Sequence, residues 1–247
     1  MSDALTMTGR CLRLTRRQLD ALLTSLLLPV MLMLMFVYLF GGAIHTGTRY
    51  VTYVVPGVLM VCAGFGAATT AVNVTQDMTG GVIDRFRSMD VRGTAFLTGH
   101  VVASAARNLV STVLVFSVAY LIGFRPHASV GGWLAAAGIL LAFVLAISWL
   151  AAAFGLLVKS VEAANSFTFI MAFVPYASAA FVPVATMPWW IQGFARDQPI
   201  TPVVDSLRAL LLGTPAGSAP WIALIWCGGL LTAAAAASSL LFRRRTA

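Results

Sequence analysis

The side chains that most often build metal or redox centres are few and scattered in this sequence. The cysteines are Cys11, Cys62 and Cys227, and the histidines are His45, His100 and His127. The cysteines are odd in number and none belongs to a CxxC pair, so neither a disulfide framework nor a zinc site is indicated. The histidines lie far apart along the chain, and a histidine-based metal site has no support. We therefore predict no metal site.

A nucleotide site has equally little support. Lys159 is the single lysine, and the nearest approach to a phosphate-binding loop is the run GLLVKS at 155–160. This run lacks the spacing of a Walker A loop and the glycine directly before the lysine, and the end of a membrane helix explains it better. No GxSxG or HExxH motif occurs, and every Asp and Glu lies at or outside a predicted membrane boundary. We predict no catalytic residue, no cofactor bound by this chain and no ion-coupling carboxylate within the membrane.

One charged stretch has a composition that suits protein docking. Gly80 and Gly81 break a helix, and an apolar edge with helical spacing then alternates with charges. The residues of this predicted coupling segment are Val82, Ile83, Asp84, Arg85, Phe86, Arg87 and Met89. A short helix with one apolar edge and several charges favours contact with the surface of a second protein. The alternative is a solvated turn.

Composition places the chain in a membrane. Of 247 residues 60% are hydrophobic and 10% are charged, and the mean hydropathy is +0.90. A soluble protein of this size cannot cover so much apolar surface. The net charge of +8 comes from short basic clusters between long apolar runs, which is typical of membrane orientation rather than of nucleic-acid binding. All basic residues but Lys159 are arginine, a bias that indicates a GC-rich bacterium and its inner membrane.

Apolar runs nearly free of charge predict six transmembrane helices in an all-α integral membrane protein. The runs are 21–44, 50–76, 101–124, 132–158, 163–184 and 221–242. Each is long enough, at about 1.5 Å per residue, to cross a hydrocarbon core of roughly 30 Å. Twelve basic residues fall on the side of both termini and four on the opposite side. The positive-inside rule therefore places both termini in the cytoplasm.

Arg107 is the charge that interrupts a run. If the third helix begins near His100, Arg107 lies about 10 Å inside and its side chain extends to the cytoplasmic interface. The alternative is a buried functional charge.

Two segments flank or interrupt the spans within the single predicted domain, 1–247. Residues 6–23 combine arginines with a leucine face and predict an amphipathic helix in the cytoplasmic interface. Residues 185–220 form an external segment with several prolines, which predict re-entrant or surface-lying half-helices before the sixth span. In it, Trp189 and Trp190 are expected as interfacial anchors, and Asp205 and Arg208 as a structural i,i+3 pair.

These features together resemble the ABC-2 type transporter permeases, in particular the daunorubicin-resistance-like membrane subunits. The run GVIDRFRSM at 81–89, followed by Leu97 and Gly99, is similar to the family's coupling segment within 76–100. The external run from Pro188 to Arg208 is similar to a second family motif. Two departures are Asp90, where proline is frequent, and Gln198, where asparagine is frequent.

The resemblance implies an ATP-driven exporter of a hydrophobic or amphipathic compound (a drug, antibiotic, lipid or glycolipid). It implies two cytoplasmic ATPase subunits that bind ATP and Mg, and a second copy or paralogue of the permease. Membrane lipids are the remaining expected partners. The alternatives are a membrane scaffold without a transport cycle and, third, an ion-coupled secondary transporter.

A substrate path is predicted from aromatic and polar side chains on spans one, two and five. Large ambiphilic ligands favour mostly apolar pockets with few polar groups. The candidate residues are Phe36, Phe40, Phe65, Asn73, Phe169, Phe173 and Tyr176. The alternative is that these side chains pack between helices or face lipid.

Overall fold

The computed structural model describes residues 19–44, 47–80 and 93–246, without the side chains of 19–26, 93–95 and 245–246. Described residues form helices and connecting turns, with no strand among them. The elements are α2 (Leu19–Met35), η1 (Phe36–Phe40), α3 (Tyr50–Thr79), α5 (Gly93–Leu121), α6 (Val130–Leu157), α7 (Val161–Phe173), η2 (Val174–Ala177), η3 (Val184–Thr186), α8 (Trp189–Asp197), α9 (Ile200–Leu212) and α10 (Ala219–Thr246). The predicted all-α membrane fold is confirmed.

Four described helices are long and apolar enough to cross a membrane: Tyr50–Thr79, Phe96–Leu121, Val130–Leu157 and Ala219–Arg244. They coincide with the second, third, fourth and sixth predicted spans. In the first run, helical backbone continues through α2 and the π-helical η1, and Leu27–Phe40 is a shorter apolar helix. A count of six spans remains a prediction, which requires α2–η1 and the α7 region to cross as well.

The fifth predicted run, 163–184, is not one helix. The α-helix α7 ends at Phe173, and the chain continues as the 3-10 turn η2 before it leaves helical geometry at Ser178. Pro175 has no backbone N–H to donate, so one hydrogen bond of the α-helical ladder is lost where α7 gives way to the 3-10 turn. Hydropathy predicted the position of this run and missed its break.

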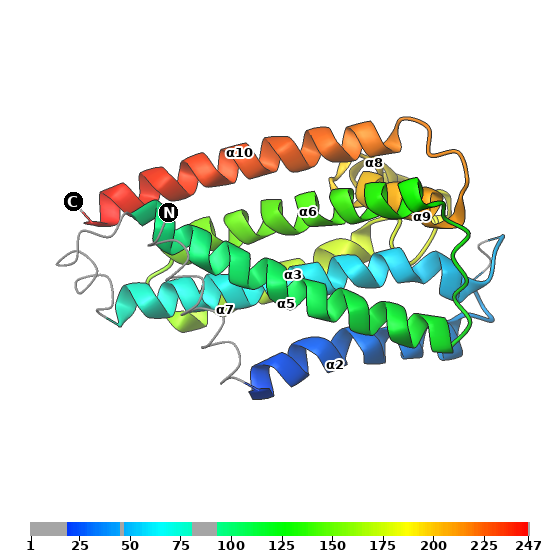
Figure 1. The fold of residues 1–247 in the computed structure, drawn as a ribbon, viewed down its shortest axis with the longest axis horizontal. Coiled ribbons are helices and arrows are strands. Elements are labelled where there is room, and N and C mark those ends of the chain that lie inside the picture. Colours follow the sequence, from blue (N-terminus) through cyan, green and yellow to red (C-terminus); the bar gives the residue numbers. More distant parts are fainter. Residues whose placement is uncertain (1–18, 45–46, 81–92, 247) are drawn as a thin grey trace.

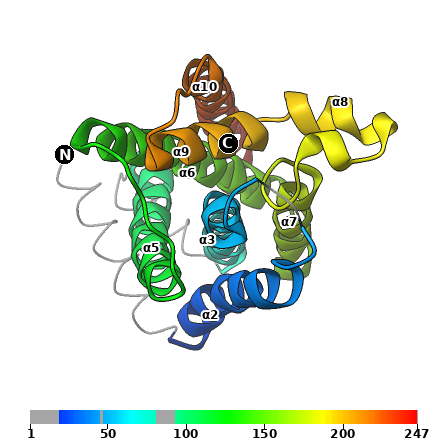
Figure 2. The same cartoon turned by 90° about the vertical axis from the view of Figure 1, so that its right-hand side faces the viewer.

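The helix α3 is the centre of the bundle (Figure 2). Helices α2, α5, α6 and α7 surround it, and 21 of its 30 residues are buried. The largest cluster of buried side chains runs along α3, and α6 and α9 contribute to the same core. The helix α10 packs along α6 and keeps much of its surface exposed. Because four helices pack on α3, it fixes the positions of the side chains that those helices carry.

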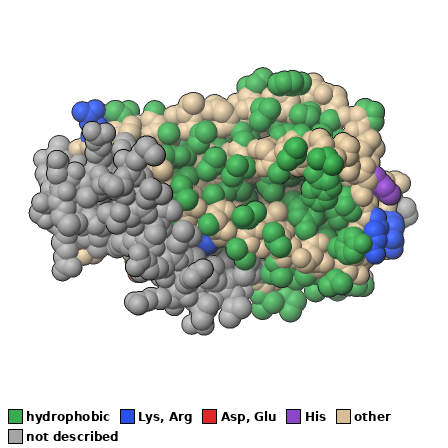
Figure 3. Space-filling view, viewed as in Figure 1, with side chains coloured by type: hydrophobic (Ala, Val, Ile, Leu, Met, Phe, Trp, Pro, Cys, Tyr) green, Lys and Arg blue, Asp and Glu red, His purple; other side chains and the backbone are tan. Residues whose placement is uncertain are grey.

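The helix ends separate into two groups (Figure 1). At one end α3, α6 and α10 finish and α5 and α7 begin; the other end carries the connections from η1 to α3 and from α5 to α6, together with α8 and α9. In Figure 3 hydrophobic side chains cover much of the described face between the ends, and the visible basic side chains lie mainly at the ends. Helices that run back and forth between two ends are what the predicted membrane topology requires. Which of the two ends faces the cytoplasm remains a prediction.

Labelling of introduced cysteines in intact cells measures that orientation. Thr48 and Ser218 are exposed at the end predicted to be external, and Lys159 is exposed at the opposite end. With Cys11 replaced by Ser, we expect Thr48→Cys and Ser218→Cys to react with an impermeant thiol reagent. Lys159→Cys and Ser88→Cys are expected to react only after the cells are opened. The reverse pattern would show that the orientation is inverted.

Candidate functional site

The predicted coupling residues, Val82 to Met89, lie outside the described residues. The two helices that lead into and out of this segment are described, and side chains join them. His100 Nε2 of α5 lies 3.1 Å from Asp77 Oδ2 of α3, and both side chains are largely buried. The ring of Phe96 meets His100 edge-on at 4.8 Å and lies 6.1 Å from Phe242 of α10. The base of the coupling segment is therefore fixed to three helices.

The run at 155–160 contains no phosphate loop. Gly155 lies inside α6, where a Cβ would come within 2.5 Å of the Ala71 carbonyl oxygen of α3. Thr75 Oγ1 donates to the Gly155 carbonyl at 3.0 Å, and Ser160 Oγ caps α7 by accepting from Ala163 N. Gly155 thus serves close helix packing and Ser160 begins a helix. Among the described residues no cluster of three or more His, Cys, Asp or Glu side chains is placed to hold a metal ion.

Three of the seven predicted substrate-path residues meet in one aromatic cluster. Phe36 lies 5.4 Å from Phe40 and 6.1 Å from Tyr176, measured between ring centroids. Phe181, which the sequence did not single out, stacks on both Phe36 (4.6 Å) and Tyr176 (4.8 Å). Its role depends on the bend after α7, which no hydropathy pattern reveals.

The other four residues do not join that cluster. Phe65 and Asn73 are partly buried on α3. Phe169 and Phe173 are exposed, Phe173 to 68%, and they lie about 200° around α7 from Met171, which packs on Gly64 of α3. The seven side chains therefore do not enclose one cavity within the described part of this chain. The rings of Phe169 and Phe173 point away from α3.

The external segment contains two short helices, each begun by a proline. Pro188 precedes α8 and Pro199 precedes α9. Helix α8 projects from the bundle (Figure 2), and on it Trp189 is 85% exposed beside the exposed Trp190 and Phe194. An exposed aromatic face next to Arg196 at the end of the bundle is typical of a helix at a membrane–water interface.

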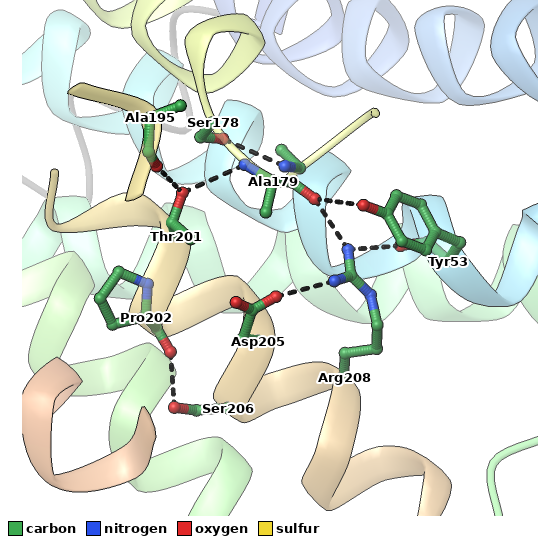
Figure 4. A network of polar contacts seen from close by, with 10 residues as sticks. Tyr53, Ser178, Ala179, Ala195, Thr201, Pro202, Asp205, Ser206 and Arg208 are labelled. Carbon is green, nitrogen blue, oxygen red and sulfur yellow. Dashed lines mark hydrogen bonds and ion pairs between the residues drawn. The ribbon is translucent and has the colours of Figure 1, made fainter. Parts of the chain in front are cut away.

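Helix α9 packs into the bundle, with eight of its residues buried. Arg208 attaches it to α3 (Figure 4). Arg208 Nη1 donates to Asp205 Oδ1 at 2.8 Å, so the pair expected from the sequence spacing forms. Arg208 Nη2 donates to the carbonyl oxygens of Tyr53 (3.2 Å) and Ala179 (2.9 Å), and the guanidinium carbon lies 3.7 Å from the Tyr53 ring centroid. One side chain thus joins α9, α3 and the non-helical segment after η2.

The same non-helical segment has further polar partners. The Tyr50 and Tyr53 hydroxyls donate to the Phe181 and Ala179 carbonyls, each at 3.0 Å. Thr201 Oγ1 of α9 accepts from Ala179 N at 3.1 Å, and Gln198 Nε2 donates to the Ala177 carbonyl. Irregular backbone at membrane depth is tolerated only where protein groups satisfy it, and these side chains satisfy it here.

The Asp205 carboxyl contributes less to this network than Arg208. Burial raises the pKa of Asp205 above its ordinary value, and the nearby Arg208 guanidinium acts in the opposite direction. The Asp205 side chain is 44% exposed against 17% for Arg208. Since removal of an exposed partner costs little, the pair itself is a weak source of stability. The two carbonyl contacts and the stacked ring carry the attachment.

A second polar cluster, missed at the sequence level, lies between α3, α5 and α6. Ser104 Oγ donates to the Gly66 carbonyl at 3.2 Å, and Ser148 Oγ of α6 donates to Ser104 Oγ at 2.8 Å. Asn108 packs so closely on α3 that a Cβ at Gly66 would lie 2.4 Å from Asn108 Nδ2. Hydroxyl and amide side chains of this kind join helices within membranes.

Arg107 belongs to this cluster. It is only 8% exposed, and its Nη2 donates to Thr70 Oγ1 of α3 at 3.0 Å. Asp77 and His100 fix the register of α3 and α5, and in that register Thr70 lies level with Arg107. The side chain reaches across to α3 and not along the helix to the interface, so the snorkelling interpretation is wrong. Arg107 is a buried charge, and its functional role remains a prediction.

The fold defines a multi-span, all-helical membrane protein whose described polar groups hold helices together. The chain belongs to the ABC-2 type transporter family, whose model matches residues 3–212. The resemblance inferred from the motifs is thereby confirmed.

Two relatives cover most of the chain. Over 228 residues it is 28% identical to the daunorubicin resistance ABC transporter permease protein DrrB1 of Streptomyces coeruleorubidus, with 92% of this chain and 81% of that protein aligned. Over 246 residues it is 22% identical to the probable doxorubicin resistance ABC transporter permease protein DrrC of Mycobacterium tuberculosis, with 99% and 89% aligned.

The Arg208 attachment predicts unequal effects of substitution. Arg208→Ala removes two carbonyl contacts and the stacked ring besides the ion pair, and we expect a loss of about 2 kcal/mol, or a fall in Tm of roughly 4–8 °C. Asp205→Asn removes only the charge pair and is expected to lower Tm by much less. Thermal unfolding of the purified protein in one detergent compares the two variants. Equal falls would show that the ion pair carries the attachment.

Proposed function

We propose that this chain is the membrane-spanning permease subunit of an ATP-driven ABC exporter that moves a hydrophobic or amphipathic compound out of the cytoplasm or inner leaflet. The observation that carries the proposal is the family match over residues 3–212, which includes the predicted coupling segment. The relatives are named as permeases for daunorubicin or doxorubicin resistance, and anthracycline-like compounds are therefore the first substrates to test.

Energy is supplied by partners in this proposal. Two cytoplasmic ATPase subunits bind ATP and Mg, and this chain pairs with a second copy or a paralogue of itself. Both termini and the coupling segment face the cytoplasm of a bacterial inner membrane. The four long apolar helices support the membrane-spanning part of this role.

Coupling passes through residues 82–89 in this proposal. Val82, Ile83 and Phe86 insert into a cleft of the ATPase, while Asp84 and Arg85 fix the register by charge pairing. The contacts of Asp77 with His100 and of Phe96 with Phe242 support this role, because they attach both ends of the segment to α3, α5 and α10. Displacement of the segment then reaches three helices together. Such a device requires two packings of the spans that ATP switches.

Phe86→Ala is the sharpest test of coupling. Truncation of a central apolar anchor commonly costs more than about 1–2 kcal/mol of binding, whereas a rim charge costs less. We expect Phe86→Ala to weaken co-purification with the ATPase or to abolish its stimulation by substrate, while membrane insertion stays normal. Arg85→Ala is the matched control, with a milder and salt-sensitive effect.

The measurements are co-purification, ATP turnover with and without an anthracycline, and ATP-dependent uptake of that compound into inverted vesicles. Wild-type assembly and transport by Phe86→Ala would reduce the segment to a solvated turn. Failure of the wild-type pair to couple ATP to uptake of any lipophilic compound would favour the scaffold alternative.

The substrate path is a separate proposal. If the partly buried Phe65 and Asn73 of α3 and the exposed Phe173 of α7 border a central cavity formed with a second permease, their loss changes which compounds are exported. We expect Phe65→Ala, Asn73→Ala and Phe173→Ala each to alter the relative uptake of several anthracyclines, with assembly retained. Leu134→Ala, an exposed aliphatic residue on α6, is the control. Unchanged uptake of every compound in all three variants would remove this path.

A further inference from the structure

An apolar groove lies between α5 and α6, beside the polar cluster to which Asn108 belongs and apart from the predicted coupling and substrate-path residues. Its volume is about 230 Å³, and α3, α5, α6 and α9 line it. Leu59 of α3 and Leu207 and Leu211 of α9 are buried at its floor. Leu109 and Leu141 also line it and are exposed.

Two contacts between α5 and α6 bound the groove along its length. At one end Ser148 Oγ donates to Ser104 Oγ at 2.8 Å, and at the other the rings of Phe116 and Trp133 meet edge-on at 5.4 Å. Between these contacts the two helices are not closed against each other. Trp133 and Val144, both lining residues, are 11 positions apart on α6, which corresponds to roughly 16 Å.

The chemistry of the lining excludes a polar or charged occupant. Among the described residues that line it, Asn108 and Thr112 are the polar ones and none is charged. Asn108 Nδ2 already donates to the Ser104 carbonyl at 3.0 Å. Water enters a cavity only where several polar partners hold it, so a groove of this composition stays dry.

The size and position of the groove exclude further kinds of occupant. The volume lies below the roughly 300–1,000 Å³ typical of pockets for drug-sized molecules. A helix of a second copy, about 10 Å or more in diameter, does not fit into it. The groove lies between Phe96–Leu121 and Val130–Leu157, two helices that are each long and apolar enough to cross a membrane.

We propose that the groove binds one acyl chain of a membrane phospholipid, with its headgroup outside the groove. The chain restores the dispersion contacts that an empty apolar space lacks. It also packs against Leu207 and Leu211, which lie roughly 60–100° around α9 from Arg208. The bound lipid is therefore a structural component that supports α9. This inference does not depend on the exporter function.

Trp133 supplies the probe. In the full-length chain with the other five tryptophans replaced by Phe, phosphatidylcholine with a dibrominated acyl chain is titrated into the detergent-solubilised protein. We expect a saturable, single-site loss of Trp133 fluorescence, because bromine quenches indole on contact. Ala137 lines the groove, and Ala137→Leu should weaken this phase at least about tenfold. Ala135→Leu, exposed on the same helix outside the lining, should leave it unchanged.

Thermal unfolding provides a second readout. Added lipid should raise the Tm of wild type and of Ala135→Leu more than that of Ala137→Leu, since a ligand stabilises only the folded protein that binds it. Quenching that rises without saturation and is equal in all three proteins would show ordinary surrounding lipid and overturn the proposal. If an anthracycline relieves the saturable quenching, the groove binds a transported compound instead. If Leu141→Cys forms a cross-link between two copies, the groove belongs to an interface with a second copy.

Discussion

The fold depends on a central helix that has almost no surface of its own. α3 is buried along most of its length, so each neighbour must approach it closely and each polar group near it must find a protein partner. Lipid tails are as apolar as leucine, and helices in a bilayer associate through close packing and hydrogen bonds rather than through the hydrophobic effect. Gly66 and Gly155 meet the first demand, and the hydroxyls of Thr70, Thr75 and Ser104 meet the second.

The same constraint explains the arrangement after α7. Once Pro175 ends regular hydrogen bonding, the backbone around Ala179 has no helical partners, and lipid offers none. The partners come from far along the chain: Tyr53 from α3, and Thr201 and Arg208 from α9. The break in the fifth apolar run and the insertion of α9 are therefore one structural event. Helix α9 supplies two of the side chains that the break requires, Thr201 and Arg208.

Much of the architecture could be predicted because hydropathy depends on composition over long windows. Four apolar runs became long helices, Pro188 and Pro199 marked the starts of α8 and α9, and the spacing of Asp205 and Arg208 gave their ion pair. Contacts between side chains on different helices could not be predicted from the sequence. The pairing of Asp77 with His100 joins residues on two helices across the coupling segment, and Phe181 becomes part of an aromatic cluster only because the chain bends. Short residues such as Ser104 and Ser148 hardly change a hydropathy average, although their contact determines where α5 and α6 meet.

Two of the polar attachments of α3 lie near its opposite ends. Tyr53 contacts the external network and Asp77 contacts the base of the coupling segment, 24 positions or roughly 36 Å away. A helix buried on nearly all sides cannot bend freely without opening its packing with several neighbours at once. In the proposed exporter, a displacement imposed at Asp77 and His100 therefore acts on α3 as a rigid body and reaches the carbonyls that hold Arg208. In that proposal α3 mechanically joins helix α9 to the predicted coupling segment, because the packing around α3 resists bending.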